Sequence, residues 1–327
     1  MQAGNFQSFR DIFLSKLEKL FLVPADTFDN VNGDFPIGFF VWNTSKKHKD
    51  KIVVSDVFDA NSKFLTTKKI LFFDKSIKRI NDWIDYYKID IINNIGVIMA
   101  DAPDFQNNKY ISILNDKTSR HGKFMYIDYN NLIIICIYYA VRLCIEATWI
   151  NDRDQFLYPE DGWEKDLEFQ SDCLAFTLFH GQNRITSEEG INHWIPFSEA
   201  EVEAKNNFES HFMKDFIDGK IKPKETKELL TERRSLKPIK FSKEAKDIFE
   251  AGRELWKYYH KHDLININAS YYDIRKFFQG VDSKSGRMNN KSIDETYNKL
   301  IGNLRERMKI LAKKIEPKIY EFGFLKK

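Results

Sequence analysis

A run of 19 residues, Leu132–Ile150 (LIIICIYYAVRLCIEATWI), is apolar almost throughout and leaves few folds that could hold it. Such a run forms either a membrane-spanning helix or a helix buried in a protein core. Arg142 and Glu146 lie near its middle, four residues apart, and two charges are costly in hydrocarbon. The run therefore predicts a core helix over residues 131–149 and no membrane partner.

The length and composition indicate an ordinary globular protein. The chain has 327 residues, enough for about two domains and one or two hydrophobic cores. Its 43% hydrophobic and 30% charged residues, with 14 Gly and 8 Pro, exclude collagen-like and low-complexity disordered chains. Because 15% of the residues are aromatic, rings should supply much of the buried area.

The cysteines and the first residues of the chain indicate the cellular compartment of the protein. Cys136, Cys144 and Cys173 are odd in number, form no CxxC pair and lie in apolar runs. They favour a reducing compartment over a disulfide framework or a cysteine zinc site. The first residues, MQAGNFQSFRDIF, lack the basic and apolar regions of a secretory signal. We therefore expect a cytoplasmic protein.

The net charge of +3 conceals an asymmetry along the chain. Residues 1–204 carry 22 Lys and Arg against 30 Asp and Glu, whereas residues 205–327 carry 29 against 18. A basic C-terminal region is what a surface that binds phosphates requires. A solvated helical face with excess lysine is the alternative, and the asymmetry alone does not decide between them.

The predicted elements describe a mixed α+β chain. Phe6–Leu22 has apolar residues at helical spacing, whereas Phe21–Val23 and Pro36–Trp42 are short apolar runs between turn formers. A helix followed by two strands is typical of the end of a layered α/β domain. Further strands are predicted at 52–58, 68–73, 95–100 and 110–114, and further helices at 77–88, 169–179, 199–218, 242–259, 270–278 and 294–315.

We expect the chain to divide at residues 219–241, which are rich in Lys, Glu, Thr and Pro. This linker would separate an α/β unit at residues 1–70 and a mixed region at residues 71–218 from a basic helical domain at residues 242–327.

The usual enzyme motifs are missing from the sequence. The glycines never occur as GxG, and GxxxxGK[ST], GxSxG and HExxH are also missing. Nine acids between Glu146 and Asp172 are a candidate magnesium site, an acidic surface, or part of a turn in which Asn151 and Asp152 cap backbone amides. Pro103-Asp104 resembles the start of a nuclease metal site, but no acid-x-Lys follows at the right spacing. We therefore expect no metal site, and a metal-dependent nuclease remains a remote alternative.

A polar segment between aromatic runs, HGQNRITSEEGINHW, offers side chains for recognition. They either bind base edges and phosphates or hold the loop in place. The candidate residues are Gln182, Asn183, Arg184, Asn192 and His193.

Several stretches together resemble the C-terminal half of a bacterial adenine-specific DNA methyltransferase of the restriction-modification type. They are FQSFRDIFLSKLEKLFLVPADTFDNVNGDFPIGFFVWNT, NLIIICIYYAVRLCIEATWINDRDQFLYP, DCLAFTLFHGQNRI, INHWIPF, LWKYYH, YYDIRKFFQG and KIYEFGFLKK. The resemblance covers nearly the whole chain. It implies that the first stretch is the last helix and final β-hairpin of a Rossmann-like domain, which in the family binds S-adenosylmethionine and flips an adenine out of the duplex.

The sequence also departs from the family. The aromatic-x-Gly-x-Gly cofactor turn and the catalytic [DNS]PP[YFW] tetrapeptide are missing, and the chain contains no Pro-Pro. The resemblance therefore implies a chain that lacks the catalytic motif, has no catalytic residues of its own, and does not hold S-adenosylmethionine when alone.

The resemblance also implies site residues. Phe28 and Phe35 would form an aromatic wall beside the extruded base, unless they are core rings. The rest of the chain would contact double-stranded DNA and recognise the target. The basic residues expected to include phosphate contacts are Arg233, Arg234, Lys237, Lys240, Arg275, Lys276, Arg305, Arg307, Lys313 and Lys314.

Two functions remain open at this point. The first is a DNA-binding, non-catalytic portion of such a methyltransferase that works with a catalytic chain. The second is a protein-interaction module, or a subunit completing a split methyltransferase, whose open sheet docks on another chain or on a second copy.

Overall fold

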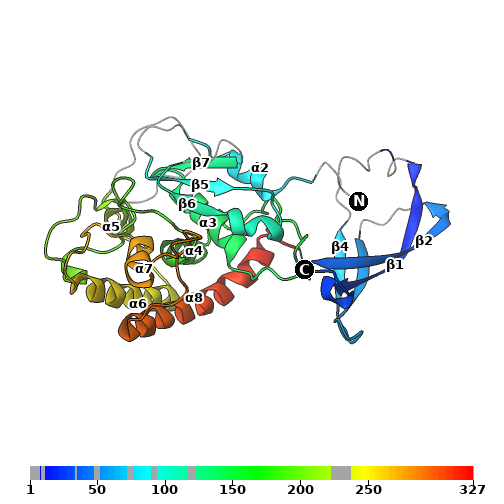
Figure 1. Ribbon diagram of the computed structural model, residues 1–327. Coiled ribbons are helices and arrows are strands. Elements are labelled where there is room, and N and C mark those ends of the chain that lie inside the picture. Colours follow the sequence, from blue (N-terminus) through cyan, green and yellow to red (C-terminus); the bar gives the residue numbers. More distant parts are fainter. Residues whose placement is uncertain are drawn as a thin grey trace.

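The computed structural model combines two β-sheets with several helices, which confirms the mixed α+β class (Figure 1). The first sheet is built from residues before 72, and the second sheet packs with the helices in a part that we call the body, residues 77–326. The structure describes residues 8, 12–33, 35–47, 52–71, 77–89, 94–116, 123–221 and 237–326.

The first sheet has four strands in the order β2-β1-β3-β4. β1 pairs antiparallel with β2 and parallel with β3, and β3 pairs antiparallel with β4. The predicted hairpin is therefore present as β1 and β2, with a short 3₁₀ helix, η2 (Ala25–Thr27), between them. The strands are β1 (Ser15–Pro24), β2 (Pro36–Lys47), β3 (Ile52–Phe58) and β4 (Phe64–Leu71).

The helix predicted over Phe6–Leu22 is wrong from Ser15 onward, where β1 begins. A register shift between Leu17 and Lys19 explains the error. This irregularity puts Leu17 and Leu20, three residues apart, in the same buried cluster. The resulting spacing imitates a helix period, although β1 is a strand paired on both sides.

The first sheet has one buried face and one exposed face. The inner face carries Leu20, Leu22, Val53 and Val57, which pack with Trp149 and Ile150 of the body. At the same junction the Nζ of Lys68 donates to the Asp154 carboxylate over 2.8 Å. The sheet is thus joined to the body through residues 149–154, which follow the long apolar run.

The body contains a three-stranded sheet in the order β6-β5-β7, with antiparallel pairs, and helices that pack against one another. β7 was not predicted from the sequence. The elements are α2 (Ile80–Asp85), β5 (Gly96–Ala100), η3 (Phe105–Tyr110), β6 (Ser112–Leu114), β7 (Lys123–Ile127), α3 (Leu132–Leu143), α4 (Leu167–Phe179), η4 (Ala200–Val202), α5 (Phe212–Ile217), α6 (Lys243–His260), α7 (Tyr271–Gln279) and α8 (Glu295–Glu321).

One hydrophobic cluster runs from Ile80 to Leu325. We expected the helices after residue 241 to form a separate domain, but α6 and α8 contact each other and α4, and α8 also contacts α3. Part of the expected linker packs on the body as well, since the Ile239 N–H donates to the Ile217 carbonyl and Phe241 lies 4.6 Å from Phe249. The helical C-terminal region therefore completes the core of the preceding residues.

The apolar run forms α3, as predicted, but the helix ends at Leu143. A turn follows, in which the side chain of Asn151 accepts from the Thr148 N–H and donates to the Glu146 carbonyl. Of the alternatives that the sequence left open here, the turn capped by Asn151 is thus present. Among the described helices, none combines the length and apolar character that crossing a bilayer requires.

The predicted helix over Glu199–Asp218 is wrong for most of its length. Only η4 and α5 are helical there, with Glu203 in the left-handed region at φ 56°. The Glu199 carboxylate accepts from the Phe208 N–H over 2.8 Å, which fixes a loop instead of a helix. Phe212 and Phe216 lie four residues apart in α5, and their rings stack with centroids 6.2 Å apart.

Arg142 is fully buried in the body and is surrounded by neutral groups. Its guanidinium donates to the Asn108 side chain, the Tyr138 hydroxyl and the carbonyls of Ala102 and Asp104 at 2.8–3.1 Å. The Tyr138 hydroxyl donates in turn to Asn81 of α2. A single buried charge thus ties α3 to α2 and to the segment that follows β5.

We expect Arg142→Met to lower the free energy of unfolding by more than about 3 kcal/mol, because the change leaves several buried acceptors without a donor. Urea denaturation measures this value. Arg287→Met removes an exposed cation that forms no ion pair with a described acid and serves as the control, with an effect below about 1 kcal/mol. Equal effects of the two changes would contradict the structural role of Arg142.

Candidate nucleic-acid interface

The predicted polar loop and the predicted basic helix meet at one place in the body. Asp273 of α7 accepts from the Thr186 hydroxyl over 2.6 Å and from the Ser187 N–H and hydroxyl over 2.9 and 2.7 Å. The same carboxylate accepts from the Ser270 N–H in a capping box at the start of α7. Asp273, which the sequence did not single out, therefore fastens the loop to the helix.

Arg275 lies directly beside this junction. Its Nη2 donates to the Gly181 carbonyl over 2.9 Å, and its guanidinium lies 4.9 Å from the centre of the Tyr271 ring and 5.8 Å from that of Tyr272. Its Nε is buried and makes no hydrogen bond within the described part of the chain. The guanidinium of Arg275 therefore lies over the rings of Tyr271 and Tyr272, and its Nε–H has no described hydrogen-bond acceptor.

Two further arginines approach the same group of tyrosines. Burial raises the pKa of Tyr139, and the positive charges of Arg275 and Arg184 oppose this rise. Burial also raises the pKa of Tyr271, where Arg275 and Arg305 oppose it. We call Arg184, Arg275 and Arg305, each of which acts on Tyr139 or Tyr271, the arginine cluster; they belong to the loop, α7 and α8.

The arginine cluster is not neutralised internally. Arg184 and Arg305 are exposed, and none of the three forms an ion pair with a described acid. Arg184 donates to the side chain of Gln182, a neutral partner. Positive charges that have no acidic partner attract an anion.

Other predicted basic residues are already paired with acids. Lys314 contacts Glu168, Asp172 and Glu244 at 2.7, 2.9 and 3.3 Å. Lys276 contacts Glu188 at 2.6 Å, and Arg307 contacts Asp247 at 3.5 Å. The buried position of Asp172 explains why Lys314 is a structural cation.

The remaining basic candidates divide into two sets. Lys237, Lys240 and Lys313 are exposed and have no ion pair to a described acid. Arg233 and Arg234 lie outside the described residues.

The polar loop candidates also divide. Asn183 donates to the Thr177 carbonyl, Asn192 donates to the Asn268 carbonyl, and both asparagines are buried. The Nδ1 of His193 lies 2.7 Å from the Ser210 hydroxyl. These three side chains hold the loop in place, whereas Gln182 and Arg184 lie at the surface.

Phe28 and Phe35 lie in the connection between β1 and β2 of the first sheet, whereas the arginine cluster belongs to the body. Their exposed fractions are 38% and 37%, so neither is a core ring. Phe28 lies 6.0 Å from Phe39 of β2, and the Phe35 ring folds back over Gly33. No described ring contact joins Phe28 and Phe35 to each other in a common wall.

The acidic run has structural partners in the described chain. Asp152 lies 3.1 Å from Arg153, Asp154 pairs with Lys68, and Asp166 caps α4. Among the described residues, no three His, Cys, Asp or Glu side chains gather in a metal-binding arrangement. Asp104 of the Pro-Asp pair caps η3.

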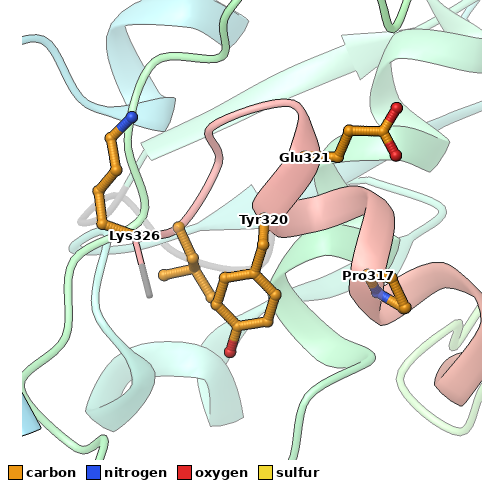
Figure 2. Close-up of a pocket in the computed structure, with 5 residues that line it drawn as sticks. Pro317, Tyr320, Glu321 and Lys326 are labelled. Carbon is orange, nitrogen blue, oxygen red and sulfur yellow. The ribbon is translucent and has the colours of Figure 1, made fainter.

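A shallow hollow lies at the end of α8 (Figure 2). It measures about 320 Å³ and is lined by Pro317, Tyr320, Glu321, Leu325 and Lys326. This lining combines one acid and one amine with apolar side chains, and it offers no nucleophile paired with a base. The arginine cluster is therefore the stronger candidate site.

His180 lies beneath the arginine cluster. Its Nδ1 faces two groups that carry protons, the Tyr139 hydroxyl at 2.8 Å and the Gln182 N–H at 3.3 Å. Burial, with Arg275 nearby, lowers the pKa of His180 to about 3. The histidine is therefore neutral in the folded protein at pH values where it is charged in the unfolded chain.

This difference predicts that His180 contributes stability above its unfolded pKa of about 6.5, and that the contribution is lost as the pH falls. Between pH 7 and pH 5 the loss is about 2 kcal/mol. His180→Asn removes the titration and keeps an acceptor for Tyr139. Urea denaturation at both pH values should show that the variant loses about 2 kcal/mol less than the unchanged protein, whereas equal losses would contradict the assignment.

Comparisons with known proteins leave the family open. The chain matches no protein-family model, no curated protein and no solved structure. Its resemblance to adenine-specific DNA methyltransferases therefore stays a prediction that depends on the sequence stretches given above.

Proposed function

We propose that this chain is the DNA-binding, non-catalytic portion of an adenine-specific DNA methyltransferase of the restriction-modification type. The arginine cluster supports this proposal, because its three arginines come from three elements, act on the buried tyrosines Tyr139 and Tyr271, and have no described acidic partner. Guanidinium groups bind phosphate oxygens with two parallel hydrogen bonds, and phosphate contacts position a protein on duplex DNA.

The rigidity of the site favours the same function. Asp273 holds the loop against α7, and Arg275 is held by Gly181 and two tyrosine rings. A cation fixed in advance loses little conformational entropy when it binds a phosphate. Double-stranded DNA is therefore the partner that we propose for this surface.

The Rossmann-like origin of the first sheet is also a proposal. It is supported by the antiparallel β1–β2 hairpin and by the parallel pairing of β1 with β3. In this view the S-adenosylmethionine site and the catalytic tetrapeptide belong to a separate catalytic chain.

A second candidate is a subunit that docks on such a catalytic chain. One observation favours it: within the described residues, β2 and β4 each pair on one side only. Edge strands present unpaired N–H and C=O groups, and these can pair with a strand of another protein.

DNA binding is tested with Arg184→Ala and Arg305→Ala in the full chain. Each change should weaken duplex binding regardless of sequence and reduce the slope of log K against log salt by about one, as expected for a lost phosphate contact. Fluorescence anisotropy across a salt series measures both effects. Lys299→Ala is the control, because Lys299 is exposed on α8 but lies roughly 120° around the helix from Arg305.

Duplex binding that is unchanged in both arginine variants would contradict this interface. An equal loss in the Lys299 variant would instead indicate an unspecific response to net charge.

The non-catalytic assignment has its own test. The purified chain should neither retain S-adenosylmethionine in a calorimetric titration nor transfer its methyl group to adenine in duplex DNA. Binding of S-adenosylmethionine or methyl transfer by the chain alone would refute the proposal that these functions belong to a separate catalytic chain.

A further inference from the structure

The outer face of the first sheet carries a row of exposed rings. Phe21 of β1 and Phe39 of β2 are register partners, and their rings stack with centroids 4.7 Å apart and an interplanar angle of 11°. Phe28 adjoins Phe39 at 6.0 Å, Phe58 adjoins Phe21 at 6.3 Å, and Phe64 adjoins Phe58 at 5.8 Å. We call these five side chains the phenylalanine row.

The phenylalanine row is not part of the core. Phe21, Phe28, Phe39 and Phe64 are 37%, 38%, 38% and 52% exposed. The sheet buries its other face through Leu20, Leu22, Val53 and Val57. Because strand side chains alternate between faces, the rings are left on the outer face by the same register that builds the inner one.

The charges of the sheet favour a negatively charged occupant. The four strands carry six lysines, at positions 16, 19, 46, 47, 68 and 69, and two acids, Glu18 and Asp56. This excess occurs within the acidic part of the chain. Lys68 is already paired with Asp154, and Lys16 lies 3.9 Å from Glu18. Lys19 pairs in register with Val41, and Lys69 with Val54, so both lysines belong to the face that carries the rings, which also holds one acid, Asp56, the register partner of Phe21.

We propose that this outer face binds single-stranded nucleic acid, with unpaired bases stacked on the phenylalanine row and phosphates near the lysines. Exposed rings on a basic sheet are suited to this ligand, since every base has a flat face and every linkage a negative charge. This inference rests on the proposed function in one respect: both assign nucleic acid as the ligand. It adds a second surface and a single-stranded ligand.

The test uses the full chain and a labelled oligothymidylate of roughly 12 nucleotides, a length within the usual site sizes. Phe21→Leu and Phe39→Leu keep apolar side chains but remove the flat ring. Each should weaken binding about tenfold or more in fluorescence anisotropy. An abasic oligonucleotide of the same length should bind the unchanged protein as weakly as the intact one binds these variants.

The matched controls are Val41→Thr and Val54→Thr. Both valines lie exposed on the same face, and threonine keeps their shape while lowering their hydrophobicity. Base stacking requires that these variants bind oligothymidylate within about twofold of the unchanged protein. Circular dichroism of all four variants checks that the sheet is folded.

Three results would overturn the inference. Unchanged oligothymidylate binding in the phenylalanine variants excludes stacking, and equal binding of the abasic probe excludes base contacts. A change in sedimentation coefficient caused by all four variants, with binding unaffected, would assign the face to a second protein copy. Duplex binding, measured in parallel, should respond to Arg305→Ala and not to Phe21→Leu, so failure of the duplex proposal is distinguishable from failure of this one.

Discussion

The body of this protein is organised around one buried cation. Arg142 satisfies its guanidinium with an amide, a hydroxyl and two backbone carbonyls, all neutral. A charge in a protein interior is tolerated only when hydrogen bonds replace its hydration. The partners must therefore keep fixed positions, and this requirement holds α2, α3 and the segment after β5 in one arrangement.

The protein treats its other cations in two ways. Lys314 is surrounded by three carboxylates and connects α8 to the starts of α4 and α6. The arginine cluster has rings and neutral acceptors around it instead. The positive charge of Lys314 is neutralised by these carboxylates inside the fold. The positive charges of the arginine cluster are not neutralised by a described acid, so they can attract an anion. Whether a cation has an acidic partner in the structure therefore distinguishes structural cations from candidate binding residues. The number of basic residues in the sequence does not make this distinction.

The two sheets also differ in what they leave exposed. The sheet of the body belongs to the large hydrophobic cluster, through residues such as Ile98 and Ile113. The first sheet has a small cluster on one face only, and its outer face retains rings and lysines. The proposed duplex surface and the proposed single-strand surface thus lie on different parts of the chain and use different physical forces.

The sequence was informative where one local rule decided the outcome. The apolar run with two charges predicted a core helix, and Ser242 was correctly placed at the start of α6, because capping depends on adjacent residues. Arg275 and Gln182 were candidates by residue type. That α7 would lie against the polar loop was not predictable, because the hydrogen bonds that join them, from Thr186 and Ser187 to Asp273, connect residues 87 and 86 positions apart.

The amino-acid sequence by itself determined the mixed α+β class, the buried helix α3 and the basic character of the C-terminal region, since these follow from composition and short periods. Only the tertiary structure decided that Ser15–Pro24 is a strand, that the last helices share the core of the body, and which basic residues remain unpaired. The physical reason is that strand register, core sharing and ion pairing depend on contacts between residues far apart in the chain, and local patterns do not encode those contacts.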